Sequence, residues 1–112
     1  MAAITTNLVP LTGLRFDNLL AAANASDDAE TGAGIVLVVK NGNAGACTVT
    51  ITTPETVDGD LAVADRVVSV PATTGETLIP LTSRYRDPTT GRCTITFSPT
   101  SSVTRCVVRV AS

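Results

Sequence analysis

Alternating residues near the C-terminus constrain the fold of this 112-residue chain more than any other feature. In residues 92–98, Cys93, Ile95 and Phe97 fall on one face of an extended backbone, and polar residues fall on the other. This period of two is typical of a half-buried β-strand. Residues 103–110 alternate in the same way, and the Pro/Ser segment between the two runs predicts a β-hairpin.

The second run is predicted to bury one face only. The face expected to be buried carries Cys106, Val108 and Val110. The opposite face carries Arg105, Val107 and Arg109. Its two arginines are interpreted either as a solvated strand face or as a positive spot for carboxylates of a protein partner.

Upstream segments supply the strands that cover this hairpin. Residues 35–40 are almost continuously apolar, which is typical of a central strand buried on both faces. Residues 47–53 alternate strictly, and residues 61–70 and 76–81 read as further strands, with Pro80 at a sheet edge or strand end. The pattern predicts a soluble all-β fold, a small antiparallel β-sandwich or barrel of about six to eight strands.

The N-terminal segment predicts an extended arm over residues 1–15, ahead of a single β-domain over residues 16–112. Such an arm either caps the domain's own sheet edge or adds a strand to a neighbour. Its apolar residues are our candidate partner contacts: Ile4, Leu8, Val9, Leu11 and Leu14. The following residues 16–24 predict either a short helix or a continued edge strand.

Two polar segments are predicted to be loops. Residues 25–34 carry three acidic residues without the spacing of a calcium-binding loop, so we expect a solvated loop there. Residues 82–91 place Tyr85 between Arg84 and Arg86. An amphipathic ring flanked by arginines is a second candidate partner contact. The alternative is that Tyr85 packs over the end of the β-domain.

Composition argues against several function classes. A net charge of −2 with one lysine speaks against nucleic-acid binding, and no apolar run is long enough to span a membrane. With no histidine and no phosphate-binding loop, we predict that the chain is not an enzyme and uses no cofactor or metal. The N-terminus lacks the pattern of a secretory signal, so we expect the protein to act without crossing a membrane by itself.

Three cysteines are expected on the inward faces of strands, where a free thiol behaves as a small hydrophobe. These residues are Cys47, Cys93 and Cys106. A disulfide between two of them, or a metal site of three thiolates, is the alternative.

Several segments resemble small structural proteins of tailed bacteriophages, particularly phages that infect actinobacteria. The resemblance rests on residues 39–42, 48–59, 63–72, 79–88 and 91–98, followed by 102–104. Such proteins are similar to capsid decoration, or cement, proteins. The resemblance implies a structural virion protein on the capsid surface, made in the cytoplasm of the host bacterium. It implies the major capsid protein as partner and a homo-oligomer, with a trimer favoured. A head-tail connector or tail-tube subunit, and a surface- or carbohydrate-binding β-module, are the alternatives.

Overall fold

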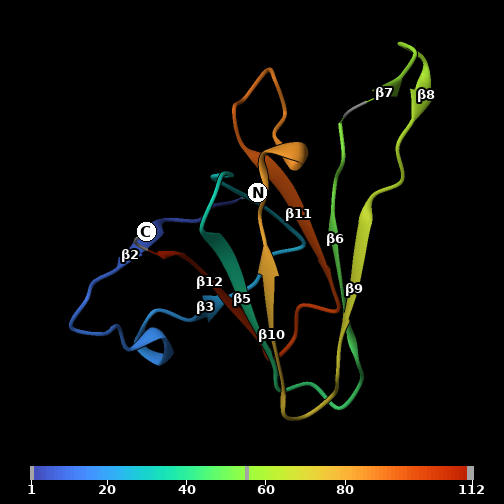
Figure 1. The fold of residues 1–112 in the computed structure, drawn as a ribbon. Helices are drawn as coiled ribbons and strands as arrows, with labels where there is room; N and C mark the ends of the chain where they lie inside the picture. The colour runs from blue at the N-terminus through green and yellow to red at the C-terminus, as the bar shows by residue number, and fades with distance from the viewer. Residues whose placement is uncertain (1, 55, 111–112) are drawn as a thin grey trace.

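A computed structural model describes residues 2–54 and 56–110 of the chain. Met1, Ala111 and Ser112, which belong to the predicted arm and β-domain, lie outside the described residues. The fold is all-β and sandwich-like, with two main sheets stacked against each other (Figure 1). The predicted fold class is therefore confirmed.

The first layer, sheet 1, contains five strands. In spatial order they are β1 (Ala2–Ala3), β4 (Ser26–Ala29), β11 (Cys93–Ser98), β6 (Cys47–Ile51) and β9 (Arg66–Val70). The second layer, sheet 2, has the order β10 (Gly75–Pro80), β5 (Ile35–Asn41), β12 (Val103–Val110) and β2 (Thr6–Val9), and β3 (Ala21–Ala22) also pairs with β12. A separate two-stranded hairpin, β7 (Thr56–Val57) with β8 (Leu61–Ala62), extends from sheet 1 beyond the ends of the other strands (Figure 1).

Alternation decides which residues form the interior. Strands β11 and β6 bury every second residue, as their sequence pattern predicts, and β5 is buried on both faces at the centre of sheet 2. The largest fully buried apolar side chains come from both sheets and from the loop after β10: Leu37, Val39, Val49, Ile51, Val70, Leu81, Ile95, Val103 and Val107. The predicted edge position of Pro80 is confirmed, since Pro80 ends β10 at the edge of sheet 2.

The predicted hairpin at the C-terminus is wrong. Strand β11 pairs with β4 and β6 in sheet 1, whereas β12 pairs with β5, β2 and β3 in sheet 2. The turn between them therefore carries the chain from one layer to the other. A Pro/Ser turn marks a reversal of direction, but it does not say whether the two strands exchange hydrogen bonds.

The prediction of which face of β12 points into the sandwich is also wrong. Val103, Arg105 and Val107 point into the sandwich, while Cys106 and Val108 are buried on the outer side of sheet 2. Val110 is exposed. Both faces of this strand are largely covered, so alternation alone did not distinguish the interior from the exterior.

Two segments before β5 also differ from expectation. Residues 16–24 form neither a regular helix nor one strand, but a single 3₁₀ turn, η1 (Phe16–Asn18), followed by the short strand β3. Residues 26–29 of the expected loop form strand β4, with Asp27 fully buried. A strand of this composition depends on tertiary pairing, because aspartate has little intrinsic strand preference.

Candidate partner-binding surface

The N-terminal segment lies along one edge of both sheets. Strand β1 pairs in parallel with β4, and β2 pairs in parallel with β12. The side chain of Ile4, between these two strands, is buried in the main core, and its amide donates a hydrogen bond to the Asp28 carbonyl over 2.8 Å. The arm therefore completes the sandwich as well as covering its edge.

Two polar side chains tie the arm to the body. The Arg92 guanidinium forms an ion pair with Asp28 (Nε–Oδ2, 3.0 Å) and donates through Nη2 to the carbonyl of Ile4 over 3.2 Å. The side-chain amide of Asn7 donates a hydrogen bond to the carbonyl of Val107 over 3.3 Å. Backbone pairing and one side-chain hydrogen bond thus attach the arm to each sheet, through Arg92 at sheet 1 and through Asn7 at sheet 2.

A buried ion pair joins the two sheets beneath the arm. Arg105 of β12 contacts Asp27 of β4 through Nε and Oδ2 at 3.0 Å, and the two side chains are 9% and 0% exposed. Asn24 completes the site by donating its side-chain amide to Asp27 Oδ1 over 2.9 Å. Burial alone would raise the pKa of Asp27, but the hydrogen bonds from Arg105 and Asn24 outweigh it and hold this pKa below its ordinary value.

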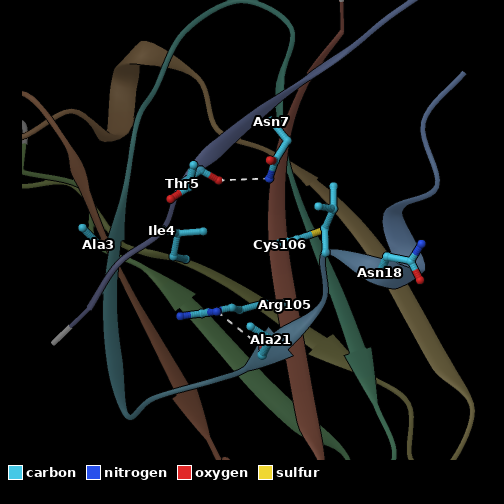
Figure 2. Close-up of a pocket in the computed structure, with 9 residues that line it drawn as sticks. Ala3, Ile4, Thr5, Asn7, Asn18, Ala21, Arg105 and Cys106 are labelled. Carbon is cyan, nitrogen blue, oxygen red and sulfur yellow. Dashed lines mark hydrogen bonds between the residues drawn. The ribbon is translucent and has the colours of Figure 1, made fainter. Parts of the chain in front are cut away.

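A cavity of about 350 Å³ lies beside this pair, between the arm and β12. Figure 2 shows Arg105 pointing away from β12, with Ile4 above its guanidinium and a hydrogen bond to the carbonyl of Ala21. Arg105 is the charged residue among those that line the cavity, and Asp27 already neutralises it. The cavity therefore presents no unpaired charge that would select a ligand.

The outer face of sheet 2, the side away from sheet 1, is apolar at its centre, and one neighbouring row on it carries Glu76, Lys40 and Thr104. Its centre is a second buried cluster that contains Val38, Cys106 and Val108. Partly buried residues packed against this cluster are Val9, Leu14, Leu19, Leu20 and Val36. Four of these five residues belong to residues 9–20, so the end of the arm and the segment after it cover part of this face.

Residues 9–20 cover this face only in part, and several apolar side chains stay in contact with solvent. Leu78 of β10 is 67% exposed and lies in one cross-strand row with Val38 and Cys106. Val110 shares the face of Cys106 on β12 and is half exposed. Leu11 is fully exposed and Phe16 is partly exposed in the covering segment itself. We call these four residues, Leu11, Phe16, Leu78 and Val110, the apolar rim.

The outer face of sheet 1 has a different character. Its central rows carry hydroxyl side chains, with Ser98, Thr48 and Ser69 directly opposite one another across three strands. The adjacent row contains Thr96, Thr50 and Val67. Hydroxyl side chains are well solvated, so an antiparallel sheet with this face can contact water. The sandwich therefore has one outer side with hydroxyl side chains at its centre and one outer side with an apolar centre.

The predicted arm contacts are divided by the structure. Ile4 belongs to the core, Val9 and Leu14 pack on the outer face of sheet 2, and Leu8 and Leu11 are exposed. Leu8 and Leu11 are therefore the arm contacts that remain available to a partner.

The predicted tyrosine loop contains the 3₁₀ turn η2 (Ser83–Tyr85), which buries Tyr85 in the main core. Of the two alternatives for this ring, burial at the end of the sandwich is the one observed. Its hydroxyl accepts a hydrogen bond from Arg66 Nε over 3.3 Å. Arg86 is bound to Thr31, with Nε 2.9 Å from the hydroxyl and Nη2 3.1 Å from the carbonyl. Arg84 is exposed beside them.

The three cysteines are buried and free. Their predicted inward positions hold for Cys47 and Cys93, whereas Cys106 lies under the arm on the outer side of sheet 2. Burial raises the pKa of the Cys93 thiol to about 11. Such thiols are protonated at neutral pH and are poor nucleophiles.

Two further features concern residues 2–54 and 56–110, namely metal sites and membrane-spanning helices. No group of three or more His, Cys, Asp or Glu side chains is placed to hold a metal ion in this part of the chain. The same residues include no helix with the length and hydropathy of a membrane span.

Sequence reasoning missed both the Asp27–Arg105 pair and the apolar outer face of sheet 2. One signal was present, since residues 103–110 carry apolar residues at both odd and even positions together with two arginines. A strand buried on both faces needs a carboxylate near such an arginine. No protein-family model, curated protein or solved structure matches this chain.

Proposed function

We propose that this protein is a structural virion component that binds the outer surface of a bacteriophage capsid and stabilises it. Its partner in this proposal is the major capsid protein, and it acts as a homo-oligomer, with a trimer favoured. It is made in the cytoplasm of the host bacterium and resides on the capsid surface. The resemblance to decoration proteins suggests this role, and the observation that carries it is the apolar rim on one outer side of the sandwich.

An apolar rim suits a binding role. Side chains such as Leu11 and Leu78 lose contact with water when a partner covers them, which contributes roughly 25 cal/mol per Å² of apolar surface. A protein that binds only the assembled shell stabilises that state by mass action. Many copies on one particle multiply a modest free energy per site.

The structure also suggests which parts would touch the shell. Leu8 and Leu11 project from the arm, and Leu78 projects from the uncovered side of sheet 2. Arg84 and Arg86 are a second candidate contact at the end of the sandwich. Deletion of the whole arm is a poor test of this assignment, because it would also remove Ile4 from the core.

Charged substitutions on the rim give a sharper test. Leu11→Asp and Leu78→Asp each place a carboxylate on the proposed contact surface, whereas Thr48→Asp and Ser69→Asp add the same charge at exposed positions on the outer face of sheet 1. The purified variants are mixed with particles of the phage that encodes the protein, stripped of this component. Bound copies are then counted by cryo-electron microscopy and by sedimentation.

We expect wild-type protein and both control variants to occupy sites across the whole shell. The two rim variants should bind at least about ten-fold more weakly, a loss of about 1.4 kcal/mol per site. Equal binding of all four variants would reject the rim as the contact surface. Wild-type protein that binds only one vertex would indicate a connector or tail component, and a complete absence of binding would reject the virion proposal.

A carbohydrate-binding role has less support. Sugar-binding surfaces on β-sandwiches use exposed aromatic rings as platforms, and this chain has three aromatic residues. Tyr85 and Phe97 are buried, and Phe16 alone is partly exposed.

A further inference from the structure

The arm is attached through contacts that a second copy of the chain would offer equally well. Its two strands occupy the edges of β4 and β12, and its anchoring partners are Asp28, Arg92 and Val107. All of these groups belong to the body of the protein. An arm from another copy would therefore find the same hydrogen bonds and the same core position for Ile4.

The second part of the arm, residues 10–15, joins strands β1 and β2 to the body and has the features of a hinge. In residues 10–15, Leu14 is partly buried and the other residues are exposed. The turn in this segment is closed by a hydrogen bond of 3.0 Å from the Gly13 amide to the Pro10 carbonyl. Gly13 has φ +99°, and a Cβ atom there would meet nothing within 4 Å. This turn is therefore held by few contacts.

Apolar side chains are concentrated at the hinge. Leu8 precedes it, Leu11 lies within it, and Phe16 follows it, and all three are exposed when the arm folds back on its own body. In an exchanged assembly, the hinge of each chain crosses from its own body to the neighbouring copy and so lies at the contact between the two copies. These side chains can then be buried while the contacts of residues 2–9 with β4 and β12 are retained.

We propose that the arm is exchanged between copies of this protein, with residues 2–9 of one chain paired to β4 and β12 of a second. Six hinge residues span roughly 20 Å when extended, and the shortest dimension of the molecule is 20 Å. A straightened hinge therefore reaches a neighbouring copy packed alongside. Reciprocal exchange closes a dimer, and exchange in one rotational direction closes a ring.

A disulfide placed across β2 and β12 tests the exchange directly. Leu8 and Arg109 are register partners on these strands, and both side chains are exposed. Neighbouring strands lie about 4.8 Å apart, which is within the range of Cα separations that a disulfide bridges. The double variant Leu8→Cys/Arg109→Cys is oxidised and examined on a denaturing gel without reductant. Exchange joins two chains covalently, whereas an arm folded on its own body closes a loop within one chain.

Matched variants control for random oxidation. Lys40→Cys/Glu76→Cys places the same chemistry on an exposed register pair within the body, where the two strands belong to one chain. The single variants Leu8→Cys and Arg109→Cys report collisions between molecules.

We expect covalent dimers or closed higher oligomers to be the major species for Leu8→Cys/Arg109→Cys. The body pair should stay monomeric, and the single variants should stay largely uncrosslinked. A monomeric product for the arm pair overturns the exchange, and so does the absence of any disulfide at these positions. Neither result bears on capsid binding, which the occupancy experiment measures separately.

Discussion

Asp27 on β4 and Arg105 on β12 form an ion pair of 3.0 Å that joins the two sheets where neither side chain has appreciable contact with water. The pair lies next to the arm, and its remaining hydrogen-bond partner on the Asp27 side is Asn24. Buried ions are costly unless each has its counterion. The pair should therefore specify how the two layers meet, and its loss should be felt as instability.

Replacement of Asp27 by Asn should strongly destabilise the protein. The substitution leaves the Arg105 guanidinium buried without a counterion, which costs about 3–5 kcal/mol. The free energy of unfolding in urea measures the effect. Asp17→Asn is the matched control, since Asp17 and its partner Arg15 form an exposed ion pair, and exposed pairs contribute little to stability. Similar losses for the two variants would show that the buried pair has no special role.

The stability of the wild-type protein should fall in acid in a way that depends on Asp27. Its pKa is lower in the folded state than its ordinary value of 3.8, so the unfolded chain binds the proton more tightly. The contribution of this carboxylate is present above the unfolded pKa and is lost as the pH falls through the folded pKa. Unfolding free energies measured between about pH 2 and 7 should show the gap between wild type and Asp27→Asn narrowing below about pH 4. A gap that stays constant with pH would contradict this account.

Removal of the Arg92 side chain should loosen the arm without unfolding the sandwich. Arg92→Met abolishes the ion pair with Asp28 and the hydrogen bond to the Ile4 carbonyl. Both side chains of the pair are about one-quarter exposed, so the global loss should be only about 1 kcal/mol. Amide hydrogen exchange at Ile4, which donates to the Asp28 carbonyl, should accelerate markedly. Arg109→Met is the control on an exposed arginine, and unchanged exchange at Ile4 in Arg92→Met would argue against the anchoring role.

Truncation of a buried side chain should lower the stability of the protein much more than truncation of an exposed one. Ile95 is fully buried on β11, and Ile95→Ala should cost about 2–5 kcal/mol because the cavity it leaves is only partly refilled. Val67 is 61% exposed on β9, and Val67→Ala should change stability by about 0.5 kcal/mol or less. Urea unfolding of both variants measures the difference, and a large loss at Val67 would show that the outer face of sheet 1 is covered.

The native thiols should be unreactive until the protein unfolds. Cys47, Cys93 and Cys106 are buried, and burial raises the pKa of each thiol. We expect a thiol-specific chromogenic reagent at pH 8 to label fewer than about one cysteine per native chain and all three after denaturation. Rapid labelling of the native protein at Cys106 would show that the arm opens readily above it.

The strand pattern was predictable wherever one face of a strand meets the core and the other meets water. Strands β6 and β11 follow this rule, and their predicted buried residues are buried. The all-β class followed from the same periodicity, because alternation over many short segments leaves few other ways to bury apolar side chains. The edge position of Pro80 was predictable because proline lacks an amide donor.

Pairing between distant segments was not predictable in this way. Nothing local indicates that residues 26–29 form a strand, since β4 exists through its partners β1 and β11 and through the Asp27–Arg105 pair. The parallel attachment of β1 and β2 also depends on edges that only the folded body presents. Of the candidate contacts, Tyr85 and Ile4 are buried because the ends and edges of the sandwich meet there.

By itself, then, the sequence determined the class of the fold and the position of its strongest strands, because period-two burial is a local property of the chain. Only the tertiary structure decided which sheet each strand joins, which face of β12 is interior, and which apolar residues remain uncovered. These outcomes depend on contacts between residues far apart in the chain, such as Asp27 and Arg105, whose free energy exists only after the two sheets have come together.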